Sequence, residues 1–224
     1  RMLREPQTAR PSLLVAADRS LHFAQVDWSG KIRLGKQSRP LAGVNRPQLA
    51  ATEVVLYLPP WAISPGSGAA FSRDAGGLEI VIGPVKFTAA TQADQPGTLA
   101  GKIIAIHTDG VSREIGAEQM VLRAGASAAP FFRHARAGDE IAVEWTLTGL
   151  PQGLAFHQVR DAISAQPLLI RAGEKLPGSG SFWTTRHPRS AVAVHRDGRQ
   201  AILVVVDGRS AKSAGMSLDS LTAY

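Results

Sequence analysis

Alternation of apolar and polar residues is the main pattern along this chain, and it predicts short strands rather than long helices. The alternation is clearest at residues 21–28 and 139–147, and it is typical of strands that bury one face. Glycine, proline, asparagine and aspartate interrupt the pattern and favour turns. The predicted strands are residues 11–18, 21–28, 31–34, 78–82, 85–89, 102–107 and 139–147, with a turn at residues 29–30.

Helical signals are few. One or two helical turns are predicted within residues 126–136, and Ser217 is predicted to cap a helix that begins there. The 22 glycines and 14 prolines also favour turns and strands over long helices. The predicted fold class is therefore α+β with strands dominating: a mixed or antiparallel sheet core, few helices and a β-rich middle insertion.

The predicted domain organisation has three segments. Residues 64–150 form a β-rich middle subdomain that opens with a Ser-Pro-Gly-Ser-Gly loop. Residues 1–63 and 151–224 are expected to pack together as the first and last parts of one catalytic-type domain. At 224 residues the chain can bury a substantial core in either one large or two small domains.

A hairpin is predicted near the end of the chain. Small apolar residues alternate from 191 to 194 and are followed by His195 and then Asp197-Gly198, a dipeptide that suits a tight turn with positive φ. The return segment, residues 201–206, is continuously apolar and rich in valine, which predicts a strand buried on both faces. Because the two strands are antiparallel, the polar groups that start and finish the hairpin should lie side by side at one rim.

Three short motifs lie at this rim and just after it. They are Pro-Arg-Ser-Ala at 188–191, Val-Asp-Gly-Arg at 206–209 and Gly-Met-Ser at 215–217. These motifs resemble the phosphodiester glycosidase family, whose pattern runs Pro-Arg-Thr-Ala, a hairpin, Val-Asp-Gly-Arg, and then Gly-Met-Thr at the start of a helix. The order and spacing of the motifs carry the resemblance, because each motif alone is common. Gly-Val-Asn at 43–45 also resembles a family segment, and Ala-Gln-Pro at 165–167 takes the place of a family Gly-Gly-Pro.

The resemblance implies an enzyme that hydrolyses a phosphodiester-linked sugar. Such a reaction needs a base or nucleophile at the anomeric carbon and positive charge near the leaving phosphate. Asp207 suits the first role, and two arginines suit the second because a guanidinium binds phosphate through two bonds at once. Histidine transfers protons near neutral pH. The catalytic residues so implied are Asp207, Arg189 and His187, and the substrate-binding residues are Ser190, Gly208, Arg209, Asn45 and Gln166.

The resemblance also implies the setting of the reaction. The substrate is a carbohydrate or sugar phosphate related to the cell envelope or to an extracellular polysaccharide. The expected location is periplasmic or extracellular, and neither a cofactor nor a metal ion is implied. Two family motifs, Asn-Gly-Gly-Phe-Phe and Asp-Gly-Gly-Gly-Ser, are absent from the sequence, so we expect the chain to be an internal portion of a longer protein.

Other interpretations of the same residues stay open. Arg189 and Asp207 can form a cross-strand ion pair that only stabilises the hairpin. Asn45 can be a turn residue whose side chain binds its own backbone. A second function class is a non-catalytic envelope module that binds glycan or a polyanion. The replacement of the Gly-Gly pair by Ala165 and Gln166 favours that class, because a backbone that approaches a ligand closely is usually glycine.

Composition narrows the choice of partner. The 25 basic and 18 acidic residues give the chain a net charge of +7. A positive net charge favours an anionic partner. The basic residues are scattered and aromatic residues are only 6%, so no platform for stacking bases is evident and nucleic acid is not expected. The chain has no cysteine, which excludes disulfides and thiolate metal sites within it, and it shows neither a signal peptide nor an apolar run of membrane length.

Overall fold

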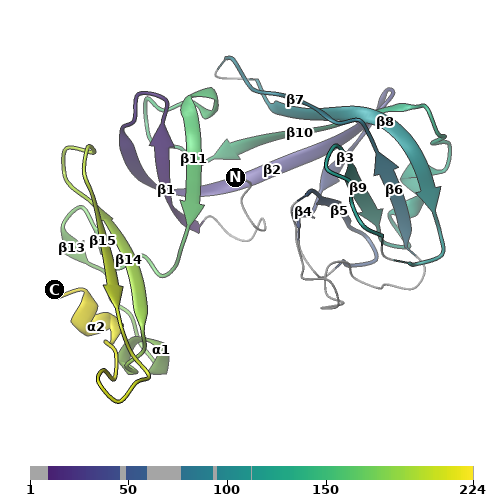
Figure 1. The fold of residues 1–224 in the computed structure, drawn as a ribbon. Coiled ribbons are helices and arrows are strands. Elements are labelled where there is room, and N and C mark those ends of the chain that lie inside the picture. Colours follow the sequence, from purple (N-terminus) through teal and green to yellow (C-terminus); the bar gives the residue numbers. More distant parts are fainter. Residues whose placement is uncertain (1–9, 46–48, 60–76, 93–94, 112, 224) are drawn as a thin grey trace. The chain divides into compact units, whose positions relative to one another are not determined.

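The computed structural model describes residues 10–45, 49–59, 77–92, 95–111 and 113–223, and Figure 1 shows the fold. These residues form two compact units. The first unit takes its described residues from 26–158, and the second consists of 10–25 and 159–223. The predicted boundary between residues 63 and 64 lies outside the described residues.

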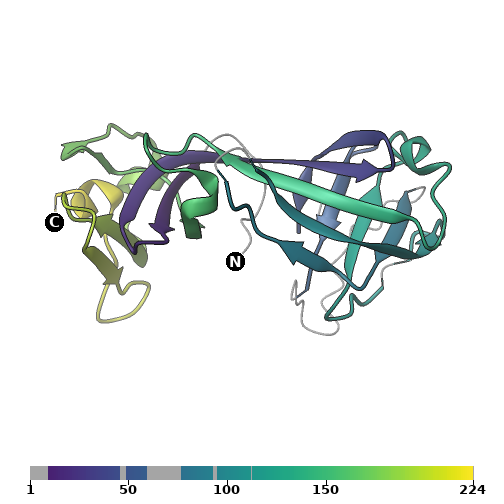
Figure 2. The same cartoon turned by 90° about the horizontal axis from the view of Figure 1, so that it is seen from above.

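The first unit is built on strands that run side by side in the order β2-β10-β8-β6-β9-β5-β4 (Figures 1 and 2). β3 pairs with β2, and β7 pairs with β8. All of these pairs are antiparallel except β4 with β5, so the sheet is mixed as predicted. The strands are β2 (Leu21–Leu34), β3 (Gln37–Leu41), β4 (Gly43–Val44), β5 (Val54–Tyr57), β6 (Leu78–Ile82), β7 (Lys86–Thr88), β8 (Gly97–His107), β9 (Met120–Ala124) and β10 (Glu140–Thr148).

One predicted turn is wrong. β2 runs unbroken through residues 29–30, where the sequence predicted the chain to reverse. A side chain at Gly30 would come within 2.8 Å of the indole ring of Trp28, and Gly30 lies opposite Trp145 on β10. The glycine is therefore needed to make room for tryptophan rings rather than to turn the backbone.

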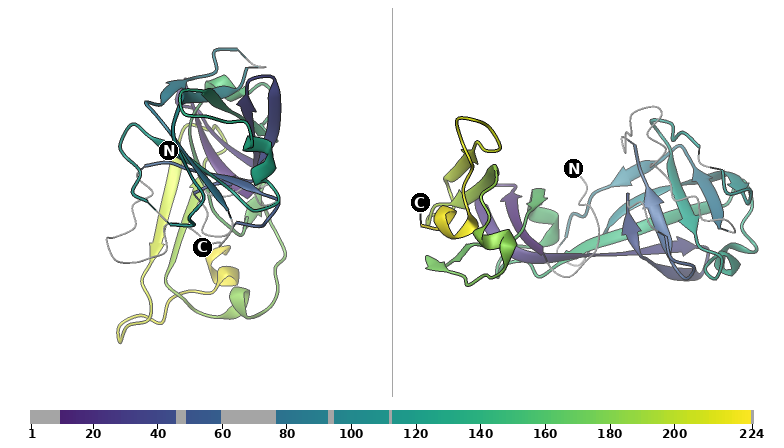
Figure 3. Two further views of the ribbon diagram at one scale, coloured as in Figure 1. Left: turned by 90° about the vertical axis from the view of Figure 1, so that its right-hand side faces the viewer. Right: turned by 90° about the horizontal axis from the view of Figure 1, so that it is seen from below.

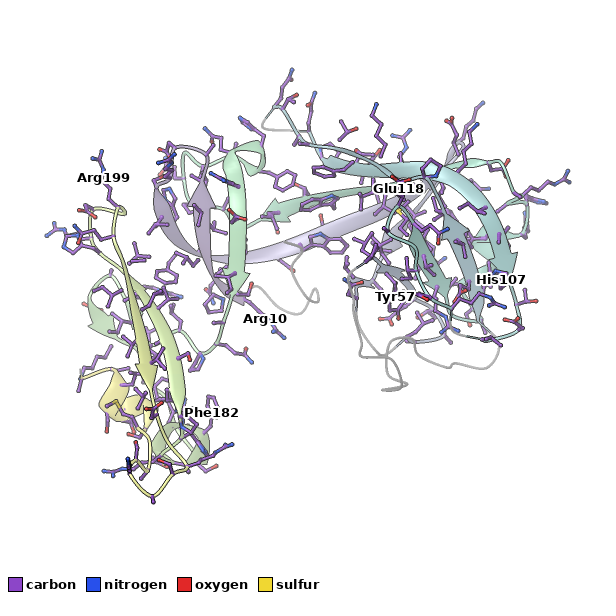
Figure 4. The ribbon with its side chains drawn as sticks, in the orientation of Figure 1. Arg10, Tyr57, His107, Glu118, Phe182 and Arg199 are labelled. Atoms are coloured by element: carbon purple, nitrogen blue, oxygen red, sulfur yellow. The ribbon has the colours of Figure 1, made fainter. Side chains whose placement is uncertain are left out.

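The core of the first unit lies around β5, β6 and β9, whose strands are buried on both faces. On one face, Val55 and Tyr57 pack with Leu49 and Val121, and Figure 4 labels Tyr57 in this cluster. Burial on both faces explains why these strands are continuously apolar rather than alternating. The opposite face contributes the fully buried side chains Leu56, Ile80, Ile82, Met120 and Leu122.

Two charged side chains lie inside this core. Glu79 on β6 is 3% exposed, and Arg123 on β9 is 1% exposed. They are direct cross-strand partners, and His107 on β8 is the partner of Glu79 on the other side. Arg113 Nη1 lies 3.5 Å from Glu79 Oε1. Burial raises the pKa of Glu79, while the positive charges of Arg123 and Arg113 act in the opposite direction.

The second unit contains β1 (Arg10–Ala16), the start of β2, and β11 (Val159–Ser164), which pairs antiparallel with β1. Two separate two-stranded sheets follow, β12 (Ile170–Arg171) with β13 (Glu174–Lys175) and β14 (Arg189–Val194) with β15 (Ala201–Val206). The helices α1 (Ser181–Thr184) and α2 (Leu218–Leu221) contact one another near the base of the β14–β15 hairpin (Figure 3). The 3₁₀ turns η1 (Ala129–Phe132) and η2 (Phe156–Gln158) belong to the first unit.

The predicted fold class is confirmed: strands dominate, the large sheet is mixed, and the described residues hold two short α-helices. The helical turn predicted within residues 126–136 is η1, and Ser217 caps α2 by accepting a hydrogen bond from the Ser220 N–H at 3.1 Å. Within the described ranges, none of the helices has the length and apolar character needed to cross a membrane.

The predicted hairpin is confirmed as β14 and β15, with Gly198 at a φ of 70° in the connecting turn. The predicted burial of β15 on both faces is wrong. Leu203 and Val205 are each 77% exposed, and Ile202 is 54% exposed. The physical reason is that, among the described strands, β14 and β15 pair only with one another, so no further layer covers β15.

The exposed face of β15 leads to a prediction about self-association. Replacing Leu203 and Val205 together with threonine should reduce aggregation at high protein concentration, because exposed apolar strands template further pairing. The melting temperature should stay nearly unchanged, since neither side chain is buried and threonine is a good strand former. Light scattering and a thermal melt measure the two effects. Val204→Thr is the matched control: Val204 is half-buried, so this change should lower the melting temperature.

Candidate functional site

The base of the hairpin brings the two predicted motif ends together. Arg189 and Val206 are the last cross-strand partners of the hairpin, so Pro188 and Asp207 follow directly beyond them. A side chain at Gly208 would lie 2.7 Å from the Pro188 nitrogen and 2.9 Å from the Gly215 Cα. Glycine is therefore required at 208 for the three motifs to meet at close range. We call this place the hairpin base, and define it by residues 187–190, 207–210 and 213–217.

His187 is held at the hairpin base through its backbone. Its N–H donates to the Met216 carbonyl at 3.2 Å, and its own carbonyl accepts from the Met216 N–H at 3.0 Å. Gly215 precedes this bridge with a φ of 89°, and a side chain there would collide with the His187 carbonyl. The imidazole contacts Arg209, whose Nη2 lies 3.3 Å from His187 Nδ1. Because a guanidinium only donates, Nδ1 is the acceptor in this contact.

Asp207 is exposed at the same base. Its backbone carbonyl accepts a hydrogen bond from Ser213 Oγ at 2.7 Å, and Ser213 Oγ also accepts from the Gly215 N–H at 3.2 Å. These bonds fix the loop between the second and third motifs. The Asp207 carboxylate has neither an ion pair nor a hydrogen bond with any residue in the described part of the chain, so it is available to solvent and to a ligand.

Arg189 donates to three backbone carbonyls. Nε lies 3.2 Å from the Met216 oxygen, and Nη2 lies 3.1 Å from the oxygens of both Phe182 and Thr185. The guanidinium also stands over the Phe182 ring, with 5.1 Å from Cζ to the ring centroid; Figure 4 labels Phe182 beside the hairpin. Arg189 therefore ties α1 and the third motif to β14. Within the described ranges, Arg189 and Asp207 do not form the ion pair that was left open as an alternative.

The phosphodiester glycosidase family model matches residues 100–224, which is more than half of the chain. The chain belongs to the phosphodiester glycosidase family. The hairpin base, with its three motifs, lies within the matched segment.

Two solved structures are similar to the chain. One is the "Putative exported protein" of Burkholderia pseudomallei, with 18% identity, a TM-score of 0.61, and coverage of 96% of this chain and 49% of that one. The other is a protein of Synechocystis, with 18% identity, a TM-score of 0.62, and coverage of 98% of this chain and 38% of that one. At this identity the likeness concerns the fold alone, and the chain spans half or less of each relative's length. No curated protein matches the chain.

Within the phosphodiester glycosidase fold, the structure brings together five of the predicted residues at the hairpin base: His187, Arg189, Asp207, Gly208 and Arg209. Ser190 is also at the base, but its cross-strand partner is Val205 whereas that of Arg189 is Val206. Successive residues of a strand point to opposite faces, so Ser190 lies on the other face of the hairpin from Arg189.

Two predicted residues lie elsewhere. Gln166 is exposed in the connection between β11 and β12, and within the described ranges it makes no hydrogen bond with the hairpin base. Asn45 belongs to the first unit, where it has a φ of 50° and its Oδ1 accepts a hydrogen bond from the Leu58 N–H at 2.9 Å. The Asn45 side chain thus binds backbone thirteen residues away rather than its own local backbone, and its role in a pocket stays a prediction.

The sequence did not predict the residues that position the side chains of the hairpin base. Phe182 and Thr185 anchor Arg189, and Ser213 positions Asp207. The only available signals were a serine pair at 210 and 213 in a short loop and an aromatic residue after a glycine-rich stretch. In the described part of the chain, no three histidine, cysteine, aspartate or glutamate side chains gather in a way that could hold a metal ion.

Proposed function

We propose that this protein hydrolyses a sugar-1-phosphodiester of the cell envelope or of an extracellular polysaccharide. In this reaction the bond between the anomeric carbon and the phosphate oxygen breaks. The oxygen of water bonds to the carbon, and the phosphate departs as a monoester. The observation that supports the proposal best is the hairpin base of a phosphodiester glycosidase family member. There the Arg209 guanidinium contacts the His187 imidazole, and Asp207, two residues before Arg209, has an exposed carboxylate.

Each of these groups has a proposed role. The Asp207 carboxylate takes the proton from water or attacks the anomeric carbon, because it is exposed and its oxygens have no hydrogen-bond donor among the described residues. Arg209 binds the phosphate that leaves as an anion. His187, whose Nδ1 accepts from Arg209, moves a proton through Nε2. Arg189 acts as a positioning residue through its three carbonyl contacts.

The other predicted parts of the site are proposals as well. Ser190, Gly208, Asn45 and Gln166 are proposed to line the substrate site. Residues 1–63 and 151–224 are proposed to act together as one catalytic-type domain. Export of the protein is supported by the family and by the description of the relative from Burkholderia pseudomallei as exported.

Turnover of a sugar-1-phosphodiester tests the proposal. The protein expressed from its own gene is incubated with a panel of N-acetylglucosamine and hexose 1-phosphodiesters, and the released reducing sugar is measured. Asp207→Asn should lower kcat/KM by about 10²- to 10⁴-fold, the usual loss for an acid–base residue. Asp219→Asn is the matched control, because Asp219 is an exposed aspartate of α2 in the same unit.

The outcomes separate two function classes. Turnover that is lost in Asp207→Asn and kept in Asp219→Asn supports hydrolysis at the hairpin base. Equal activity in both variants would remove Asp207 from the reaction. Glycan binding without turnover in the native protein would favour the alternative, a non-catalytic module that binds glycan or a polyanion.

A further inference from the structure

We propose that the first unit binds an anionic polysaccharide in an open hollow of its sheet. The hollow has a volume of about 990 Å³, at the upper end of the usual range for ligand sites. Its walls come from the end of β2 and the turn into β3, from β7, β8 and β10, and from the segment around η1. We call it the lysine hollow, and its charged or aromatic lining residues are Arg33, Lys36, Lys86, Lys102, Phe131, His134, Asp139 and Glu140.

The strand register builds the floor of the lysine hollow. Lys86 on β7, Ala100 on β8, Ala142 on β10 and Arg33 on β2 are successive cross-strand partners, so their side chains point to the same face. The two alanines in the middle are small, and the cations stand on either side of them. β7, β8, β10 and β2 lie side by side in this order in Figure 2. The row therefore forms a shallow trough with Lys86 at one flank and the Arg33–Glu144 ion pair at the other.

The next row on the same face extends the trough. Lys102 is two residues beyond Ala100 and is the cross-strand partner of Glu140. Ile141 lies between these rows and Leu99 lies next to the first row; both point to the opposite face and are buried in the core. This alternation holds the lysines of the trough on a sheet that is rigid because its other side is packed.

The charge of the hollow is available to a ligand. Lys36, Lys86 and Lys102 are exposed, and none of the three has an ion pair with any described residue. Of the acidic groups nearby, Glu144 is occupied by Lys31 and Arg33 at 3.0 Å each. Asp139 accepts a hydrogen bond from the Arg136 N–H at 2.8 Å. An incoming anion thus meets three lysines that form no ion pair within the described residues, with Glu140 directly across from Lys102.

The chemistry of the hollow favours a glycan over a nucleic acid. Single-stranded nucleic acids bind on rows of aromatic rings, whereas Phe131 is the single aromatic residue of this lining. The alanine floor suits the apolar C–H face of a sugar ring. Glu140 and Asp139 at one side disfavour a backbone with a phosphate at every unit, and tolerate a polymer with more widely spaced charges. Lysines act as point charges and accept either carboxylate or phosphate groups.

A smaller hollow of about 490 Å³ continues the surface. It shares Gln37 and Phe131 with the lysine hollow, and it adds Arg39 and Arg133. Arg133 Nε donates to His134 Nε2 at 2.9 Å, so this ring nitrogen is the acceptor in the contact. Positive charge therefore runs along one continuous surface, which is the shape expected for a polymer rather than for a single small anion.

Binding of defined polymers tests the proposal. Calorimetric titration would compare polygalacturonate, which carries carboxylates, with phosphomannan, which carries phosphodiesters. Neutral dextran and single-stranded DNA serve as comparison polymers. The polymer that binds more tightly of the first two identifies the anionic group that the hollow prefers. We expect no binding of dextran, binding of DNA at least about tenfold weaker, and a steep loss of affinity with salt because counterions are released.

A pair of charge-matched variants locates the site. Lys86→Gln with Lys102→Gln should weaken binding about tenfold and reduce its salt dependence. Lys175→Gln with Lys212→Gln removes the same charge from exposed lysines of the second unit and should change the affinity less than about twofold. Thermal melts of both variants check that the fold is kept. The Asp207→Asn variant should bind the anionic polymers as tightly as the native protein does. Polymer binding at the lysine hollow can therefore be tested even if the proposed catalysis at the hairpin base is wrong.

Several results would overturn the proposal. Equal weakening by both lysine pairs would mean that only the overall charge attracts the polymer. Tighter binding of DNA than of either glycan would make the hollow a nucleic-acid site, and equal binding of dextran would remove any role for the lysines. Absence of binding of both anionic glycans at low salt would also refute it.

Discussion

Replacing Glu79 with leucine is expected to lower the free energy of unfolding of the first unit by about 3–5 kcal/mol. The reason is that Arg123, 1% exposed, would lose the carboxylate that lies directly across from it on β6. Arg113 would lose the same partner. A buried cation that loses a nearby negative charge has a desolvation cost that the leucine side chain cannot offset. Urea unfolding followed by circular dichroism measures the change.

A double replacement separates the charge from the packing. Glu79→Leu with Arg123→Met removes both buried charges and should recover most of the stability that the single change loses, because an apolar pair of similar volume is often neutral or stabilising. Ile80→Val is the matched packing control on the same strand, and it should cost about 1 kcal/mol. If Glu79→Leu alone had no more effect than Ile80→Val, the buried carboxylate would contribute little to the fold.

The pH dependence of stability gives an independent measure of the same group. Burial raises the pKa of Glu79, so the folded protein holds this proton more tightly than the unfolded chain does. The protonation of Glu79 therefore contributes most to the free energy of unfolding at a pH below the pKa of this residue in the unfolded chain. This contribution is lost as the pH rises through the higher pKa of Glu79 in the folded protein. Glu79→Gln should remove this part of the pH dependence, and unfolding curves between pH 4 and pH 7 compare the two proteins.

Replacing Arg189 with lysine is expected to destabilise the second unit by about 2 kcal/mol. Hydrogen bonds from a charged group contribute about 1.5–3 kcal/mol each, and a part-exposed site such as this one gives less than the sum of its bonds. Lysine keeps the charge, but its single ammonium cannot reach the Met216, Phe182 and Thr185 oxygens in the same geometry. The expected loss of stability therefore rests on the three carbonyl contacts.

Thermal unfolding and enzyme kinetics together show whether Arg189 positions other residues or binds phosphate directly. A positioning role predicts that Arg189→Lys lowers both the melting temperature and kcat, since the hairpin base loosens around Asp207. Arg209→Lys is the control at the same base: Arg209 is exposed and contacts only the His187 ring through its guanidinium among the described residues, so its replacement should spare the melting temperature and raise KM for phosphate-bearing substrates. Unchanged stability in Arg189→Lys with a raised KM would instead make Arg189 a direct phosphate ligand.

The sequence by itself was sufficient for local features. Alternation identified the strands because burial of one face requires apolar residues at every second position, and Asp197-Gly198 identified the hairpin because few residues adopt positive φ. The Ser217 cap was likewise predictable from a hydroxyl preceding a short helix. The three motifs at 188–191, 206–209 and 215–217 also pointed to the phosphodiester glycosidase family, to which the chain belongs.

Only the tertiary structure decided the features that depend on distant neighbours. Gly30 resembles a turn residue in sequence, yet the Trp28 ring beside it requires a glycine within a continuous strand. The apolar run of β15 predicts burial, yet burial requires a covering layer that a local pattern does not specify. Arg189 was placed at the correct rim, but whether its guanidinium meets a carboxylate or a carbonyl depends on where α1 and Met216 pack. The lysine hollow arises in the same way, because four strands from separate parts of the chain align Lys86, two alanines and Arg33 in a single row.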